Sequence, residues 1–540
     1  MTKTESRGGR WFFPAVLLCA LAPLPTRVAE SADAPKSGGI LRAYHRDSPG
    51  GPSILEETSN SVTVPFMAVF NNLVLYKQDE PRNSVETIEP ELATGWHWNA
   101  DNTALTFQLR EGVRWHDGKP FTSNDVKCTW DLLRGKSPTP LRNNPRLGWY
   151  HNLTDVTTDG DFAVTFHLGR PQPAMLALLA SGYSAVYPCH VPPRDMRQHP
   201  IGTGPFKFVE FRQNQSITLT RNTDYWKLGL PYLDGVEYTI ITNRSTALLG
   251  FTSGKFDMTF PNEVSIPLLK DMRAQAPHAI CKLTPNNCAV NAIVNRERPP
   301  FDNPDIRLAL TLAIDRQGFI DILSEGQSVT GGSMQPPPEG VWGMPEPMLR
   351  DLPGYGKDVE QNRAKARALM EKHGYGPNNR LKIKVSARNI PTHRDPGILL
   401  VDTLKHIYID AELEPVDTAS WFPKIARKDY TLGPNITCGA VDDPDQNFYE
   451  NYACGSARNF TQYCNKDLEP LFDQQSSETD FEKRRAMVWE IDRRLQEDIA
   501  RPIIYHVNAA TCWQPYLKGF TPMVNSVYNF PRLEKVWLDR

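Results

Sequence analysis

The sequence predicts a mixed α/β protein, because two periodic patterns interleave along the whole chain. Alternating apolar positions predict half-buried strands at 105–109, 164–168 and 381–385. Apolar stripes at helical spacing predict helices at 306–320, 358–373 and 488–499. The chain has 540 residues, of which 40% are hydrophobic and 23% charged, as in globular proteins of three to four packing units. This composition excludes a disordered chain and a polytopic membrane protein.

Capping residues support the predicted helices. Asn303 and Pro304 suit the N-cap and the first position of the helix that carries the 306–320 stripe. Thr479 and Glu482 form a capping box before the third helix. Gly374 is expected to end the second helix, because glycine readily adopts the left-handed conformation that follows a helix.

Proline- and glycine-rich stretches separate these elements and predict loops or domain edges, at 137–145, 188–193, 298–304, 335–347 and 434–444. The third stretch lies directly before a strongly capped helix. We therefore expect the chain to cross between two lobes near that point.

The first 31 residues are predicted to be a signal peptide. Lys3, Arg7 and Arg10 precede an apolar run at 11–24, and small residues follow it. The run contains two prolines and is shorter than the ~20 residues that span a bilayer, so a membrane anchor is the weaker interpretation. We expect an exported, periplasmic protein.

Eight of the nine cysteines follow the signal peptide, and in an oxidising compartment they can form disulfides. Cys454 and Cys464, close together in a polar stretch, are the first expected pair. Cys281 and Cys288 are a second candidate pair, and Cys128 is expected to be a buried small residue. The chain has no CxxC pair, so a zinc ribbon has no support.

The sequence shows no catalytic or cofactor motif. It lacks HExxH, a phosphate loop and a GxSxG nucleophile elbow, and 116–118 and 202–205 are better explained as turns. A formal charge of −2 leaves no basic footprint for nucleic acid. We expect no enzyme and no cofactor, although a spatially assembled site, as in an exported hydrolase, stays open.

One long segment carries more information than the rest of the chain. The segment comprises Glu91 to Trp96, Leu105 to Thr122, and Asp125 with Val126. It resembles the signature of the family 5 extracellular solute-binding proteins, the peptide- and nickel-type binding components of ABC importers. Similar stretches follow in the family's order at 201–206, 222–226, 231–238, 303–315, 364–374 and 443–445. Cys454 and Cys464 also match the disulfide of the peptide-binding members.

The resemblance implies a two-lobed periplasmic-binding-protein fold with hinge strands and an extra small domain on the first lobe. Lobe I would comprise 40–77, 201–300 and 505–540, the extra domain 78–200, and lobe II 301–504. Hinge crossings are expected at 295–301 and 502–507. Such lobes close around a buried solute.

The solute is less certain from the sequence than the fold. Relatives that bind dipeptides hold the ligand ammonium with the Asp of a Trp-x-Gly-Asp stretch, which reads Thr437 to Ala440 here. An unpaired buried ammonium is costly, so another acid would have to replace this Asp. Asp442 and Asp443 are candidates, and the alternative is that they cap a loop before Pro444.

Three further residues are candidates for ligand binding. Trp421 is placed where lobe II presents an aromatic side chain to the cleft, with a core position as the alternative. Arg388 and Arg394 bracket the loop where peptide-binding relatives hold the ligand carboxylate, and exposed arginines are the alternative interpretation.

The leading hypothesis is therefore the periplasmic substrate-binding component of an ABC importer for a short peptide or a peptide-like solute. It would act as a monomer with an inner-membrane permease and its ATPase. A second hypothesis keeps the fold but exchanges the ligand for a metal chelate, an opine-like conjugate or a sugar. The third is the exported hydrolase.

Overall fold

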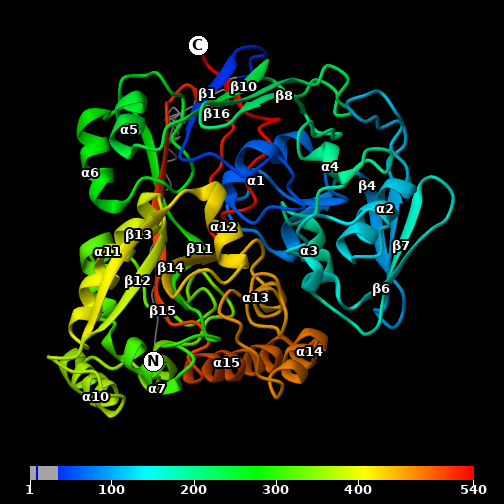
Figure 1. Cartoon of the computed structure of the whole chain (residues 1–540). Coiled ribbons are helices and arrows are strands. Elements are labelled where there is room, and N and C mark those ends of the chain that lie inside the picture. The colour runs from blue at the N-terminus through cyan, green and yellow to red at the C-terminus, as the bar shows by residue number, and fades with distance from the viewer. Residues whose placement is uncertain (1–7, 10–33) are drawn as a thin grey trace, which may run out of the picture. The chain divides into compact units, whose positions relative to one another are not determined.

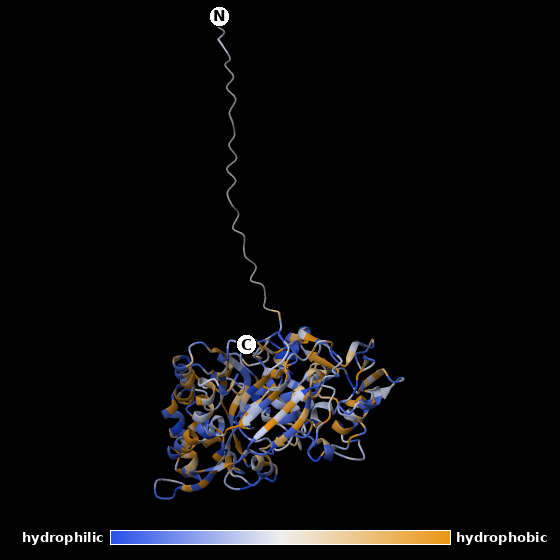
Figure 2. Ribbon diagram, turned by 90° about the horizontal axis from the view of Figure 1, so that it is seen from above, coloured by the Kyte–Doolittle hydropathy of each residue, from blue (hydrophilic) through white to orange (hydrophobic). Residues whose placement is uncertain are grey.

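A computed structural model describes residues 8–9 and 34–540. Nearly all of the expected signal peptide, 1–7 and 10–31, lies outside the described residues. The chain divides into a unit of residues 1–35 and a compact unit of residues 36–540, whose ribbon is shown in Figure 1. Apolar and polar residues interleave along its elements (Figure 2), and none of the described helices is both long and apolar enough to cross a membrane.

The first sheet has four strands in the order β1-β10-β9-β8. β1 and β10 run parallel, and the other neighbours are antiparallel. The strands are β1 (Ile40–His45), β8 (Phe206–Arg212), β9 (Ser216–Arg221) and β10 (Gly235–Ile240). Helices α1 (Asn60–Phe66), α5 (Arg244–Thr252) and α6 (Ile266–Gln275) come from the segments around these strands. Two small sheets have two strands each: β2 (Val74–Tyr76) pairs with β3 (Ile88–Pro90), and β16 (Leu517–Lys518) pairs with β17 (Trp537–Leu538).

An antiparallel sheet of order β4-β5-β7-β6 forms from the segment expected to be the extra domain. Its elements are β4 (Ala93–Trp98), β5 (Ala104–Leu109), α2 (Ser123–Leu133), β6 (Leu153–Thr158), β7 (Ala163–Leu168), α3 (Met175–Ala180) and α4 (Pro193–Met196). The predicted strands at 105–109 and 164–168 are confirmed, and their alternate apolar side chains are buried. Helix α2 packs on the sheet, where Trp130 meets Phe166 edge-to-face at 4.9 Å.

The third sheet has five strands in the order β13-β12-β14-β11-β15. Its strands are β11 (Ile280–Val294), β12 (Leu381–Arg388), β13 (Ile409–Val416), β14 (Leu432–Cys438) and β15 (Ile503–Trp513). β12 runs parallel to β13 and β14, whereas β11 is antiparallel to β14 and β15. β11 and β15 are long and lie side by side (Figure 1), so they link the regions of the first and third sheets.

The remaining helices lie between β11 and β15 in the chain: α7 (Pro304–Ala313), α8 (Arg316–Ser324), α9 (Glu346–Arg350), α10 (Val359–Lys372), α11 (Pro391–Lys405), α12 (Thr418–Ala426), α13 (Pro444–Asn451), α14 (Glu469–Ser477) and α15 (Phe481–Glu497). Short 3₁₀ helices lie at η1 (Met67–Val69), η2 (Val85–Thr87) and η3 (Leu147–Tyr150).

Two of the predicted helix ends are confirmed, whereas the extent of one predicted helix and the N-cap of another are wrong. Asn303 caps α7, and Gly374 follows α10 with a positive φ, as predicted. The stripe at 306–320 is not one helix, because Ile314 is extended and Asp315 caps a new helix, α8. The cap of α15 is Asp480 rather than Thr479, and it accepts a hydrogen bond from the Lys483 amide.

Two large apolar cores mark the two lobes of the fold. The first core gathers side chains from Leu41 to Cys288 and from Ala510 to Leu538, together with Ala440 and Val441. The second core runs from Val290 to Tyr505. β11 therefore changes cores between Cys288 and Val290, where its pairing with β15 is interrupted by a bulge.

We use "first lobe" and "second lobe" for the residues of these two cores. The change of core in β15 falls between Tyr505 and Ala510, next to the crossing expected at 502–507, whereas the change in β11 precedes the one expected at 295–301. The lobe boundaries expected from the sequence stay a prediction.

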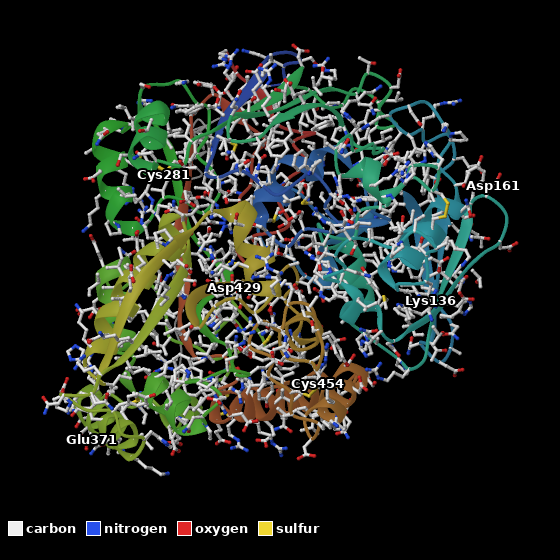
Figure 3. All side chains as sticks on the ribbon, in the orientation of Figure 1. Lys136, Asp161, Cys281, Glu371, Asp429 and Cys454 are labelled. Atoms are coloured by element: carbon white, nitrogen blue, oxygen red, sulfur yellow. A yellow bond between two sulfur atoms is a disulfide. The ribbon has the colours of Figure 1, made fainter. Side chains whose placement is uncertain are left out.

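Four disulfides join the eight cysteines of the described unit. The structure pairs Cys454 with Cys464, the pair expected first. The second expected pair is wrong, because Cys281 joins Cys512 in β15 and Cys288 joins Cys438 in β14. Each of these lies directly opposite its partner in the sheet. Cys128 is not a free buried residue but is bonded to Cys189. Cys281 and Cys454 are marked in Figure 3.

Candidate functional site

A cavity between the two lobes is the candidate binding site, and we call it the central cavity. Its volume, counted as the space open to the centre of a water molecule, is about 60 Å³. Its wall combines the loop after β1, the start of α1, the bulge of β11, the end of β14, helices α11 and α12, and the C-terminal residues 527–528. Residues from both lobes therefore surround whatever occupies it.

Helix α12 supplies the aromatic part of the wall. Trp421 and Phe422 both line the cavity, and the Trp421 side chain is almost fully buried. The Trp421 ring also packs with Ile293, Ile425 and Tyr430 in a small apolar cluster. The two interpretations of Trp421 thus describe one side chain, which is anchored in a core and borders the cavity.

Arg388 also lines the central cavity, but the first lobe already holds its charge. This residue ends β12, and its guanidinium reaches the carboxylate of Asp47, which follows β1. Asp47 also accepts hydrogen bonds from Thr418 Oγ1 at 2.6 Å and Ser61 Oγ at 2.7 Å. Burial alone would raise the pKa of Asp47, but the charges of Arg388 and Arg46 hold it well below its usual range. The group is a buried ion pair between the lobes.

The wall of the central cavity is rich in hydrogen-bond donors. Three arginines line it, and each has a carboxylate partner that is not part of the wall: Arg46 pairs with Glu263, Arg388 with Asp47, and Arg458 with Glu450. Among residues 34–540, no Asp or Glu borders this cavity. A carboxylate or carbonyl group of a solute matches such a wall better than a bare cation does.

Several buried polar atoms of this wall lack a partner. Arg46 Nε and Arg458 Nε donate to no acceptor, and Asn286 Oδ1 accepts from no donor. Buried polar atoms are usually satisfied, so these three atoms mark places beside the cavity where a polar partner is missing. His393 adds a neutral ring, because burial and the nearby charges of Arg388 and Arg46 lower its pKa well below 6.5.

The position expected for the ammonium-binding Asp carries no acid. Ala440 is fully buried, and its carbonyl accepts hydrogen bonds from Ser526 Oγ and Asn529 Nδ2. Two residues earlier, Cys438 lines the central cavity through its disulfide with Cys288. The segment contributes a wall of the cavity rather than a charge.

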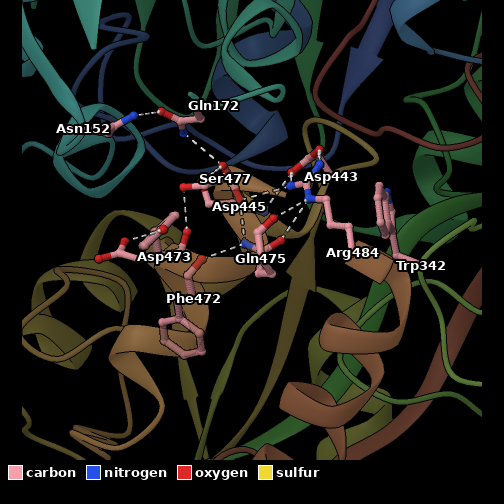
Figure 4. Close-up of polar contacts among 12 residues, drawn as sticks. Asn152, Gln172, Trp342, Asp443, Asp445, Phe472, Asp473, Gln475, Ser477 and Arg484 are labelled. Atoms are coloured by element: carbon pink, nitrogen blue, oxygen red, sulfur yellow. Dashed lines mark hydrogen bonds and ion pairs between the residues drawn. The ribbon is translucent and has the colours of Figure 1, made fainter. Parts of the chain in front are cut away.

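Asp443 lies outside the central cavity and caps helix α13, the alternative kept open for it above. Its Oδ1 accepts from the amide of Asp445 at 2.9 Å. Arg484 of α15 donates to both oxygens of Asp443 at 2.8 Å and to Asp445 at 3.1 Å. Figure 4 shows this cluster, in which Gln172 of the extra-domain segment also reaches Asp445. The negative charge of Asp443 is thus already used within the protein.

Asp442 and Arg394 do not border the central cavity either. Asp442 is partly buried, and desolvation of its carboxyl group, together with the charge of Asp443, raises its pKa to about 7; its Oδ1 has no hydrogen-bond partner. Arg394 is partly exposed and lies 3.6 Å from Asp395. Of the five residues predicted to bind ligand, the structure brings only Trp421 and Arg388 to one cavity.

Sequence reasoning missed Arg46, Asn286, His393 and Arg458. They come from segments that are far apart in the chain, and none stands in a motif. Only the nearness of Asn286 to Cys288 and of His393 to Arg388 connects them to positions considered above. Within the part of the chain that the structure describes, no group of three or more His, Cys, Asp or Glu is arranged to hold a metal ion.

Comparison with known proteins gives consistent matches over most of the chain. Residues 87–459 match the family described as bacterial extracellular solute-binding proteins, family 5 Middle. Heme-binding protein A of Haemophilus influenzae is 26% identical over 464 residues, which cover 80% of each chain. Oligopeptide-binding protein AppA of Bacillus subtilis is 24% identical over 539 residues, which cover 95% of this chain and 94% of that protein.

A solved structure shares the fold. Haemophilus influenzae OppA in complex with the peptide RPPGFSPFR superimposes with a TM-score of 0.83 at 19% identity, covering 94% of this chain and 99% of that one. The likeness extends over both lobes and the extra-domain segment, so the two-lobed α/β fold is confirmed.

Proposed function

Because this chain belongs to the bacterial extracellular solute-binding proteins of family 5, we propose that it captures a short peptide or peptide-like solute in the central cavity and delivers it to an ABC permease. The observation that carries this proposal is the wall of the cavity. Both lobes contribute buried, unpartnered hydrogen-bonding atoms and the aromatic residues of α12, which suit the amide and carboxylate groups of a peptide.

Two of the three relatives reported above support the same class of solute, whereas heme-binding protein A is named for another ligand. AppA is named for oligopeptide binding, and the OppA structure holds a nonapeptide. These relatives are named for binding and not for a reaction, which favours a binding protein over the hydrolase. Solute release would follow the opening of the lobes about β11 and β15.

The proposal extends to the setting of the protein. Residues 1–31 act as a cleavable signal, and the mature chain works in the periplasm as a monomer without a cofactor. Its partners are an inner-membrane permease and the ATPase that drives it. Lobe I comprises 40–77, 201–300 and 505–540, with 78–200 as its additional small domain. Lobe II comprises 301–504.

Native mass spectrometry of protein purified from its own periplasm tests this function, because a closed cavity retains its solute. A series of peptide masses is expected, and a single non-peptide mass would overturn the proposal. Purified protein mixed with peptides should gain about 2.7 kcal/mol of stability at a hundredfold excess over Kd. Release of cleaved products in the same mixture would instead establish an enzyme.

A further inference from the structure

A second space, which we call the side chamber, adjoins the central cavity. By the same count its volume is about 410 Å³, and the two spaces share Thr58, Ser59, Phe422 and Arg458 as walls. The first lobe contributes a loop at 49–50 and 56–57, and the second lobe contributes residues of α12. The two spaces are therefore neighbours, separated by no more than these four residues.

The side chamber carries the acidic groups that the central cavity lacks. Glu56 and Glu57 both line it. The Glu56 side chain is 1% exposed, and its Oε1 accepts from the Arg142 amide at 2.6 Å and from Arg197 Nη1 at 2.8 Å. Its Oε2 is buried without a hydrogen-bond partner. This carboxylate thus has an unused acceptor, in a residue that lines the chamber.

The charge of Glu57 is weakly compensated. Its side chain is 13% exposed, and its nearest cation is Arg142 Nη2 at 3.4 Å, which belongs to a side chain that is 59% exposed. An ion pair with so exposed a partner is worth little. Burial, and then the neighbouring charge of Glu56, raise the pKa of Glu57 to about 7, although Arg142, Arg146 and Arg388 act in the opposite direction. Burial outweighs these charges, so the ionised form of Glu57 is disfavoured even though Arg146 Nη1 donates to the Glu57 carbonyl oxygen at 2.6 Å.

We infer that Glu57, with Glu56 beside it, forms a subsite for the ammonium end of the solute, while the donors of the central cavity hold its carboxylate end. The inference rests on the proposed function, since it assigns the two ends of a peptide-like solute to the two spaces. The carboxylate of Glu57 thus holds the ligand ammonium, a role that Ala440 cannot perform.

The arginines at the junction agree with this orientation. Arg458 borders both spaces, but Glu450 neutralises it at 2.6 Å and leaves its Nε free as a donor. Arg388 is neutralised by Asp47. Arg197 is occupied by Glu56, and Arg142 extends into solvent. Arg46 and Asn286, which have unpartnered buried atoms, line only the central cavity, whereas the weakly compensated Glu57 lines only the chamber.

Three pools of tripeptides composed of uncharged residues test this assignment: unmodified, N-acetylated and C-amidated. Competition binding or isothermal titration calorimetry at pH 7.5 measures their affinities. The wild-type protein is expected to bind the N-acetylated pool at least tenfold more weakly than the unmodified pool. In Glu57→Gln this difference should shrink to within twofold, whereas the effect of C-amidation should remain.

Asp442→Asn is the matched control, because Asp442 is equally buried and has its pKa raised to about 7 but borders neither space. It should keep the tenfold preference. If N-acetylation has no effect on the wild type, or if Glu57→Gln keeps the full preference, the subsite is wrong while the proposed function stands. If none of the pools binds, the proposed function fails and the subsite with it.

A second measurement needs no variant that must fold. If an ammonium binds at Glu57, the carboxyl group loses its proton, so calorimetry at pH 7 in two buffers with different ionisation heats should detect proton release with the unmodified pool. The N-acetylated pool should release none. Equal proton release with both pools would overturn the assignment.

Discussion

The substitution Asp47→Asn is expected to weaken solute binding strongly. The change keeps the size of the side chain but leaves Arg388 buried without a counter-charge whenever the lobes are closed. Removing one partner of a buried ion pair costs about 3–5 kcal/mol. Because the pair joins the lobes, this cost falls on the closed state, and at 1.4 kcal/mol per factor of ten it corresponds to a roughly 150-fold to several-thousandfold increase in Kd.

Calorimetry with the unmodified tripeptide pool measures this effect. Asp395→Asn is the matched control, since Asp395 also faces an arginine of the other lobe, Arg244 at 3.4 Å, but is 35% exposed. A pair of that kind contributes about 0–1 kcal/mol, so its Kd should rise no more than about fivefold. If Asp47→Asn also stays within fivefold of the wild type, the buried pair does not stabilise closure and the reasoning is wrong.

Three further predictions concern single features. Burial raises the pKa of Asp442 from 3.8 to about 7, so Asp442 should lower the stability of the wild type as the pH rises from 4 to 8. In urea unfolding, the stability of Asp442→Asn relative to the wild type should therefore rise by up to roughly 4 kcal/mol over that pH range. Parallel stability curves for the two proteins would contradict this prediction. Iodoacetamide should label none of the eight cysteines from Cys128 to Cys512 before reduction, and mass mapping should return the four pairs; labelling at Cys288 or Cys438 would refute the disulfide in the cavity wall. Trp421→Phe should remove most of the change in tryptophan fluorescence on solute binding, whereas Trp130→Phe, in the core of the extra-domain segment, should leave it intact.

Local patterns predicted the elements of this fold well, and long-range pairing was not accessible from them. The alternation at 105–109 and the cap at Asn303 depend on neighbouring residues and are confirmed. The disulfide between Cys281 and Cys512 spans 231 residues, and nothing in the spacing of eight cysteines favours that pairing over its alternatives. Cys454 and Cys464 are ten residues apart, so their pairing was the one that proximity in sequence indicated.

The candidate site was predicted only where a resemblance supplied a position. Trp421 and Arg388 were named in that way and do border the central cavity. Asp443 was named from its place near Ala440, but the helix it caps and the guanidinium of Arg484 hold its carboxylate elsewhere. Glu57 has no sequence signal at all, because its weak compensation follows from the exposure of Arg142, a property of the folded chain.

The ion pair of Arg388 changes what this residue contributes to binding. A guanidinium in a cavity wall is a natural partner for a solute carboxylate. Asp47, Thr418 and the hydroxyls near α1 accept from or contact Nε and Nη2 of Arg388, and its Nη1 has no hydrogen bond within residues 34–540. Nε of Arg46 and Nε of Arg458 also have no partner. Because the pair with Asp47 forms only when the lobes meet, Arg388 connects closure to the assembly of the cavity, and its Nη1 is left as a donor in the cavity wall. The affinity for the solute would then have two separable contributions. One is the free energy by which the Asp47–Arg388 pair stabilises the closed state, and the other comes from the contacts of the solute with the free donors and with Glu57.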